Sequence, residues 1–220
     1  MRIAAVLAGA ILTGCVVIAP PVDTDADVLA IGDSILAWHR GKGASIPAVV
    51  EGRTGQNVTN QSIAGATFIG SRGIPTQFVA GDWDVVLING GGNDIGDVCG
   101  TPREAAVLEQ LISSDGQRGA IPQFVRSLRS GGAEVIWLGY YPISVAGGPF
   151  SPCRDTLDLL KARQRAMAVS LDGVAFVDPA RVIAPDNLTL YDRDLVHPSV
   201  DGAARIGGLV ASVMSGLSQP

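Results

Sequence analysis

Four short groups of glycine and polar residues follow apolar runs of this chain, and together they have the parts needed for acyl transfer. Ser34 supplies a hydroxyl nucleophile, Asn93 an amide donor, and Gly65 a backbone N–H that a ligand can approach closely. Asp194 lies three residues before His197, so its carboxylate can hold one ring nitrogen while the other faces a serine. This pattern favours attack by a serine on a carbonyl carbon with an imidazole as base.

The elements that would position these groups alternate along the chain. Apolar runs predict strands at residues 28–31, 57–62, 85–88, 135–138 and 174–177. Helical patterns are expected at residues 35–53 with a break at 41–43, and at 122–129, 157–171 and 200–214. Thr101 and Glu104 have the spacing of a capping box, which predicts another helix start. The alternation predicts a mostly parallel sheet covered on both faces, with its site beyond the carboxyl ends of the strands.

The order of the four groups resembles the GDSL or SGNH hydrolase family, named for its Ser, Gly, Asn and His. The resemblance extends over residues 31–198 and rests on Gly32-Asp33-Ser34-Ile35, Ala64-Gly65, Gly91-Gly92-Asn93-Asp94 and Asp194-Leu195-Val196-His197. It implies a flavodoxin-like three-layer α/β/α sandwich with a five-stranded sheet. Ile35 stands where the family name has leucine, an exchange of similar volume.

Carried over by block, the resemblance implies a role for each matching residue. Ser34 would be the nucleophile, His197 its general base and Asp194 the residue that orients His197. The backbone N–H groups of Ser34 and Gly65 and the amide of Asn93 would form the oxyanion hole. No cofactor and no metal are implied.

The implied reaction is hydrolysis of carboxylic esters, with a small acyl group on a carbohydrate or simple alcohol as the favoured substrate. A lysophospholipase or a thioesterase of the same family is the alternative, and a surface-tethered binding module with an inactive site is the non-enzymatic one. The intact groups argue against that last class. Loops 66–82, 140–154 and 179–193 are expected to shape the pocket, with Trp38 and Tyr140-Tyr141 as candidate wall residues.

Three further polar residues near these groups are expected to have supporting roles. His39 is too close to Ser34 along the chain to act as its base and is expected at the rim or in a structural role. Asp33 is expected to hydrogen-bond near its loop, and Asp94 to fix the turn that holds Asn93.

Composition excludes several other classes of protein. The chain has 220 residues, of which 47% are hydrophobic, which suits one folded domain. The formal net charge is −5 and no basic cluster occurs, so a nucleic-acid partner is not expected. The chain contains no phosphate-binding or dinucleotide fingerprint, and its two histidines lie far apart. Nothing in the sequence indicates an oligomeric state.

The first residues are typical of an export signal. Arg2 precedes an apolar stretch at residues 3–12, and Leu12-Thr13-Gly14-Cys15 resembles a bacterial lipobox, which implies lipid on Cys15. We expect a signal peptide at residues 1–14, a tether at 15–27 and the hydrolase domain at 28–220. The protein is expected to be a membrane-tethered lipoprotein of the bacterial envelope, with a periplasmic or secreted protein and an uncleaved anchor as the alternatives.

Two cysteines then remain for the folded domain. Cys99 and Cys153 form an even pair in an oxidising compartment and are candidates for a disulfide. Two unpaired buried thiols are the alternative, because spacing alone does not supply the geometry of the bond.

Overall fold

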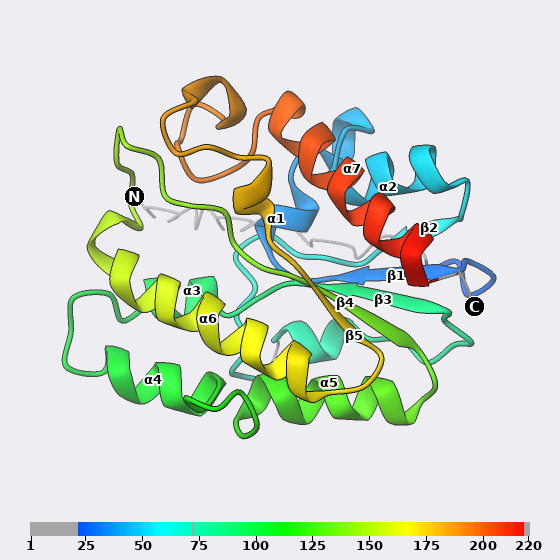
Figure 1. Ribbon diagram of the computed structural model, residues 1–220, viewed down its shortest axis with the longest axis horizontal. Helices are drawn as coiled ribbons and strands as arrows, with labels where there is room; N and C mark the ends of the chain where they lie inside the picture. Colours follow the sequence, from blue (N-terminus) through cyan, green and yellow to red (C-terminus); the bar gives the residue numbers. More distant parts are fainter. Residues whose placement is uncertain (1–21, 72, 218–220) are drawn as a thin grey trace, which may run out of the picture.

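A five-stranded sheet forms the centre of the fold in the computed structural model, which describes residues 22–71 and 73–217 (Figure 1). Its strands are β1 Val28–Ile31, β2 Val58–Asn60, β3 Val85–Ile88, β4 Glu134–Leu138 and β5 Val174–Val177. They lie in the order β2-β1-β3-β4-β5, and every neighbouring pair is parallel. This is the strand order of flavodoxin-like folds, so the predicted fold class is confirmed.

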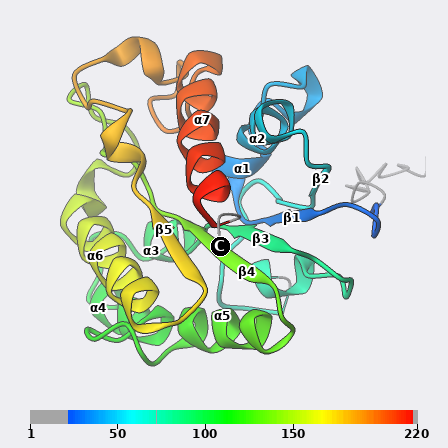
Figure 2. The ribbon, with the colours of Figure 1, turned by 45° about the vertical axis from the view of Figure 1, so that its right-hand side comes forward.

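Helices cover both faces of the sheet. Figures 1 and 2 show α2 and α7 on one face and α4, α5 and α6 on the other. The helices are α1 Ser34–Ala37, α2 Ile46–Thr54, α3 Gly92–Gly96, α4 Glu104–Leu111, α5 Ala120–Ser130, α6 Arg154–Ser170 and α7 Val200–Leu217. Short 3₁₀ helices lie at Arg40–Lys42, Ile74–Gln77, Ser151–Cys153, Pro179–Arg181 and Leu188–Leu190. The expected break after α1 is therefore present.

Burial on both faces explains the continuous apolar runs of the central strands. In β1, Leu29 and Ile31 join the core under α4, α5 and α6, whereas Val28 and Ala30 join the core under α2 and α7. All four side chains are buried. Successive side chains of a strand point to opposite faces, so a strand between two helical layers has no position for a polar residue. The polar groups of the site consequently begin where the strands end.

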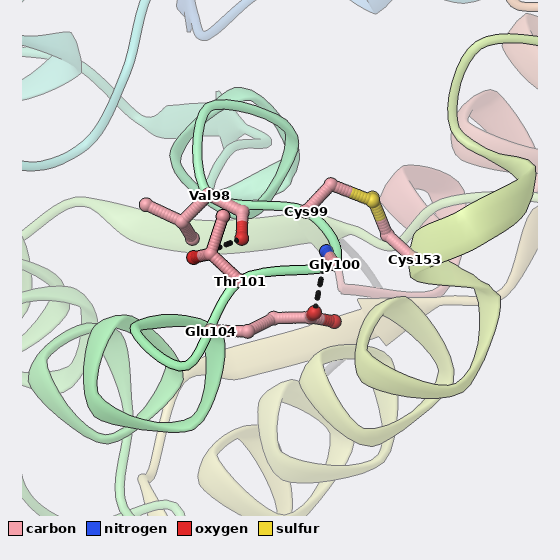
Figure 3. The surroundings of a disulfide bond; sticks show 6 residues. All are labelled: Val98, Cys99, Gly100, Thr101, Glu104 and Cys153. Atoms are coloured by element: carbon pink, nitrogen blue, oxygen red, sulfur yellow. Dashed lines mark hydrogen bonds between the residues drawn. A yellow bond between two sulfur atoms is a disulfide. The ribbon is translucent and has the colours of Figure 1, made fainter.

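The predicted capping box at Thr101 is wrong. Helix α4 begins at Glu104, whose carboxylate accepts a hydrogen bond from the Gly100 N–H at 2.9 Å (Figure 3). The Thr101 hydroxyl donates to the Val98 carbonyl at 2.7 Å. A capping box needs an extended residue at the helix start, but Arg103 there is in the right-handed helical region. The side chains of Thr101 and Glu104 therefore stabilise the tight turn that follows Cys99 and do not cap the helix.

A disulfide joins Cys99, just after α3, to Cys153, just before α6 (Figure 3). The two Cα atoms are 5.4 Å apart, within the range of roughly 4.4–6.8 Å that disulfides span. The bond links residues 54 positions apart in sequence. It fastens the loop before α6 to the helix that carries Asn93.

We expect a Cys99→Ser/Cys153→Ser variant to lose about 4 kcal/mol of the free energy of unfolding, because the bond restrains a long loop of the unfolded chain. Urea denaturation without reductant measures the difference. Wild-type protein in reductant serves as the control and should match the variant. Equal stability of the oxidised wild type and the variant would contradict this expectation.

The predicted signal peptide and the lipobox cysteine Cys15 lie outside the described residues. Of the predicted tether, residues 22–27 are described, and they contact the domain. The Thr59 hydroxyl donates to the Asp23 carbonyl at 2.9 Å, and the Asn57 N–H donates to the Asp27 carboxylate at 3.0 Å. Within the described residues, no helix is long and apolar enough to cross a membrane.

Candidate active site

Ser34 is the first residue of α1 and lies directly beyond the carboxyl end of β1. The chain can turn there because the Asp33 side chain caps α1 by accepting from the Ile35 N–H at 2.9 Å. Ser34 is half-buried and lines a cavity of about 310 Å³. Asn93, Gly65 and His197 line the same cavity, so the fold brings the four sequence groups together.

His197 is held by Asp194 in the loop before α7. Its Nδ1 lies 2.6 Å from Asp194 Oδ2, and Asp194 Oδ1 accepts from the backbone N–H groups of Val196 and His197 at 3.0 Å each. Partial burial acts to raise the pKa of Asp194, but these hydrogen bonds outweigh it and hold that pKa below its ordinary value. Asp194 is therefore a carboxylate at neutral pH and fixes the Nδ1–H tautomer of the ring.

The other ring nitrogen of His197 faces inward. Nε2 is buried and has no hydrogen-bond partner among the described residues, and neither does the Ser34 hydroxyl. Hydrogen bonds between a catalytic serine and its base are often long before substrate binds. Both groups are therefore available to interact with a substrate. A buried nitrogen without a hydrogen-bond partner costs free energy, and a proton donated by a ligand or substrate would remove that cost.

Three groups that could donate to an oxyanion lie at the cavity. Asn93 Nδ2 donates to the Ala66 carbonyl at 2.9 Å, which leaves its second amide proton for the cavity. Gly65 has φ of 76°, a conformation that favours glycine. Within the described residues, the N–H groups of Ser34 and Gly65 have no acceptor. Three donors thus border the cavity.

Asp94 holds the loop after β2 against α3. Its carboxylate accepts from the Phe68 N–H at 2.7 Å and from the Ile69 N–H at 2.8 Å. Burial raises the pKa of Asp94, and the hydrogen bonds offset part of that rise. These contacts fix Asn93 relative to Gly65.

Asp33 hydrogen-bonds within its loop as expected, and it is also the centre of a buried network whose distant partners the sequence did not indicate. Only 2% of its surface is exposed, and it accepts from Tyr140 Oη at 2.5 Å and from Asn89 Nδ2 at 2.8 Å. The phenol oxygen of Tyr140 in turn accepts from the Gly92 N–H at 2.9 Å. Burial raises the pKa of Asp33, and the hydrogen bonds it accepts offset part of that rise. The network links the residues that precede Ser34 and Asn93.

Trp38 and His39 pack against the His197 loop. The indole of Trp38 stacks on the His197 ring, with centroids 3.7 Å apart and planes 9° apart. His39 Nε2 donates to the Pro198 carbonyl at 3.0 Å. The expected structural role of His39 fits this contact, although Asp192 does lie 3.8 Å from its Nε2 and supplies a carboxylate that spacing alone did not indicate.

The cavity walls differ in part from the expected loops. Loop 140–154 contributes residues 140–143, 148, 150 and 154, and loop 179–193 contributes Tyr191. No described residue of loop 66–82 lines the cavity, and Phe68 of that loop is buried in the core. Helix α6 was not expected to contribute, yet it forms one wall. The walls around the polar groups are lined by Trp38, Tyr140, Tyr141, Pro142, Ile143, Phe150, Arg154, Leu157, Asp158, Lys161, Tyr191, Leu195 and Val196.

The sequence of this chain matches the GDSL-like Lipase/Acylhydrolase family over residues 30–205. The chain belongs to this family. The family assignment suggested by the four sequence groups is thereby confirmed, and the protein is an ester hydrolase. No curated protein matches the chain significantly.

Solved structures of several hydrolases share the fold. A candidate acylhydrolase from Bacteroides fragilis is 20% identical, with a TM-score of 0.64 over 87% of this chain and 88% of that one. A carbohydrate esterase family 2 enzyme with a carbohydrate-binding domain, from Corynascus thermopiles (Myceliophthora fergusii), is 17% identical, with a TM-score of 0.61 over 91% and 68%. A psychrotrophic esterase from Pseudoalteromonas sp. is 15% identical, with a TM-score of 0.60 over 87% and 98%. These likenesses concern the fold alone.

Proposed function

We propose that this GDSL-like acylhydrolase cleaves carboxylic esters through Ser34, His197 and Asp194. The observation that supports this most is the buried Nε2 of His197, which has no partner among the described residues while Nδ1 is held by Asp194. A base of this kind needs one nitrogen fixed and the other free to take a proton. Ser34 lines the same cavity and is the hydroxyl that would supply that proton.

The proposed reaction has two stages. His197 takes the proton from Ser34 as the hydroxyl oxygen attacks the ester carbonyl, and the resulting oxyanion accepts hydrogen bonds from the three donors described above. His197 then gives its proton to the departing alcohol, which leaves an acyl group on Ser34. Water, deprotonated by His197, hydrolyses that acyl-enzyme and restores both residues.

For the substrate, we propose a small acyl group on a carbohydrate or a simple alcohol. The carbohydrate esterase with the same fold is compatible with this choice. The apolar cavity wall at Ile143, Phe150 and Leu157 favours a second candidate, a lysophospholipase or thioesterase that binds a longer acyl chain there. A panel of p-nitrophenyl esters of increasing chain length, with acetylated sugars, separates the two.

We also propose a location for the enzyme. A lipid on Cys15 would hold the domain at a bacterial envelope membrane, and residues 22–27, which pack on the domain, leave about six residues of tether after the lipid. Detergent partitioning of the full chain and of a Cys15→Ser variant tests the anchor.

A fluorophosphonate probe tests whether the site is an active serine hydrolase or an inactive binding module. The probe reacts with an activated serine and leaves a covalent phosphonate on its oxygen. Stoichiometric labelling of the wild-type protein is expected. A protein that neither reacts with the probe nor turns over any ester of the panel would support the binding-module alternative.

Asn93→Ala is expected to lower kcat by about 10²–10³-fold, because it removes one of three donors to the oxyanion. KM should change much less, since the donor acts on a charge that develops only in the transition state. Steady-state kinetics on a p-nitrophenyl ester measure both values. Asn57→Ala, which changes an amide far from the cavity, is the matched control. A wild-type kcat in Asn93→Ala would remove Asn93 from the oxyanion hole.

A further inference from the structure

Two contacts at right angles to each other hold the His197 ring. Asp194 holds the ring edge through the hydrogen bond at Nδ1, which lies in the ring plane. Trp38 covers the ring face, with its indole parallel to the imidazole at 3.7 Å between centroids. A single in-plane hydrogen bond leaves the ring free to tilt about the bond axis. The parallel indole blocks that tilt, so Nε2 can point in one direction only.

Trp38 is itself anchored on two sides. Its indole Nε1–H donates to Asp192 Oδ2 at 2.8 Å, and its backbone N–H donates to the Ser34 carbonyl at 2.8 Å. The first contact joins the indole to the loop that carries His197. The second joins the same residue to the proposed nucleophile, one helical turn away. Trp38 therefore contacts both the segment of the proposed nucleophile and the loop of the proposed base.

The backbone on either side of this contact is strained. Among the described residues, only His39 and Leu195 adopt a positive φ without being glycine, with φ of 60° and 58°. His39 follows Trp38 directly, and Leu195 lies between Asp194 and His197. Such conformations persist only where surrounding contacts impose them, and they gather at functional sites. Here both strained residues belong to the two segments that the stack joins.

We infer that Trp38 is a positioning residue for the base, and that it sets the direction of His197 Nε2 toward Ser34. This inference rests on the proposed function. Trp38 acts through His197 rather than on the substrate, so its loss should lower kcat while the substrate still binds. A residue that served only as a cavity wall would change KM instead.

The test compares Trp38→Leu with Trp38→Phe. Leucine removes the flat face, and we expect kcat to fall by about 10–100-fold, the scale of a small misplacement of a reacting group. Phenylalanine restores a flat face without the Nε1–H and should recover most of kcat. Phe78→Leu removes an exposed ring that packs edge-on against Phe124 and lies outside the cavity, and it should leave kcat unchanged.

A second measurement reports the stack without any substrate. Proton NMR should show the His197 ring signals shifted upfield by the indole ring current in the wild-type protein, and the shift should disappear in Trp38→Leu. The chain has only two histidines, so His39→Gln suffices to assign the signals. If Trp38→Leu does not fold, Asp192→Ala, which frees the indole, should lower kcat in the same direction but less.

The outcomes separate the inference from the proposed function. Wild-type turnover with an unchanged kcat in Trp38→Leu would overturn the role of Trp38, and so would unshifted His197 signals in the wild type. A wild-type protein with shifted His197 signals but no ester turnover and no probe labelling would overturn the proposed function.

Discussion

A Ser34→Ala variant is expected to lose on the order of 10⁶-fold in kcat for ester hydrolysis, as when the nucleophile of a serine hydrolase is removed. No acyl-enzyme can form, because the other groups of the site only move protons or stabilise charge. Labelling by the fluorophosphonate should also disappear. Intact-mass spectrometry after incubation with the probe measures this directly, since each reacted molecule gains the mass of one phosphonate.

Ser62→Ala is the matched control for this change. Ser62 is buried near the site, and its hydroxyl donates to Asn60 Oδ1 at 2.5 Å, away from the cavity lining. We expect this variant to be labelled like the wild type. Labelling that persists in Ser34→Ala and is lost in Ser62→Ala would transfer the nucleophile to the other serine.

Asp194→Asn is expected to lower kcat by about 10⁴-fold while the fold remains intact. The amide oxygen would stay with the N–H groups of Val196 and His197, so the amide NH₂ would face Nδ1. It could neither hold the Nδ1–H tautomer nor stabilise the imidazolium that forms when Ser34 loses its proton. The lowered pKa of Asp194 means that its carboxylate persists through mild acid. Protonation of Asp194 should therefore contribute nothing to the change of wild-type kcat/KM as the pH is lowered into mild acid.

Asp192→Asn distinguishes this role from a general effect of charge in the same loop. Asp192 is also a carboxylate, but it anchors the Trp38 indole rather than the His197 ring. An asparagine there still has an oxygen to accept that bond, so the loss of kcat should be far smaller. Equal losses in the two variants would show that Asp194 has no special relation to His197.

The sheet and the gathering of the four groups could be predicted because they depend on local signals. Each central strand contains a continuous apolar run of four residues, which is the pattern of a strand buried on both faces. Parallel strands end at the same edge, so residues that follow them must meet there. The failed capping box had an equally clear local pattern. It failed because Glu104 bonds to Gly100, in a turn next to the disulfide.

The contacts that support the site could not be predicted, because their partners are distant in sequence. Tyr140 reaches Asp33 across 107 residues, and Trp38 reaches Asp192 across 154. Nothing near any of these residues marks the other. Trp38 and Tyr140 were candidates for the cavity wall, and they do line it, but their contacts with His197 and Asp33 required the structure.

The disulfide divides the chain in a way that bears on redesign. The proposed nucleophile and all three donors precede Cys99, and Asp194 and His197 follow Cys153. The enclosed stretch carries much of the cavity wall, from Tyr141 to Phe150. The reacting groups and this part of the substrate wall thus occupy separate stretches of the gene. Within the enclosed stretch, the loop at residues 141–150 is therefore the part to vary for substrate choice, because β4, α4 and α5 belong to the core and Tyr140 bonds to Asp33.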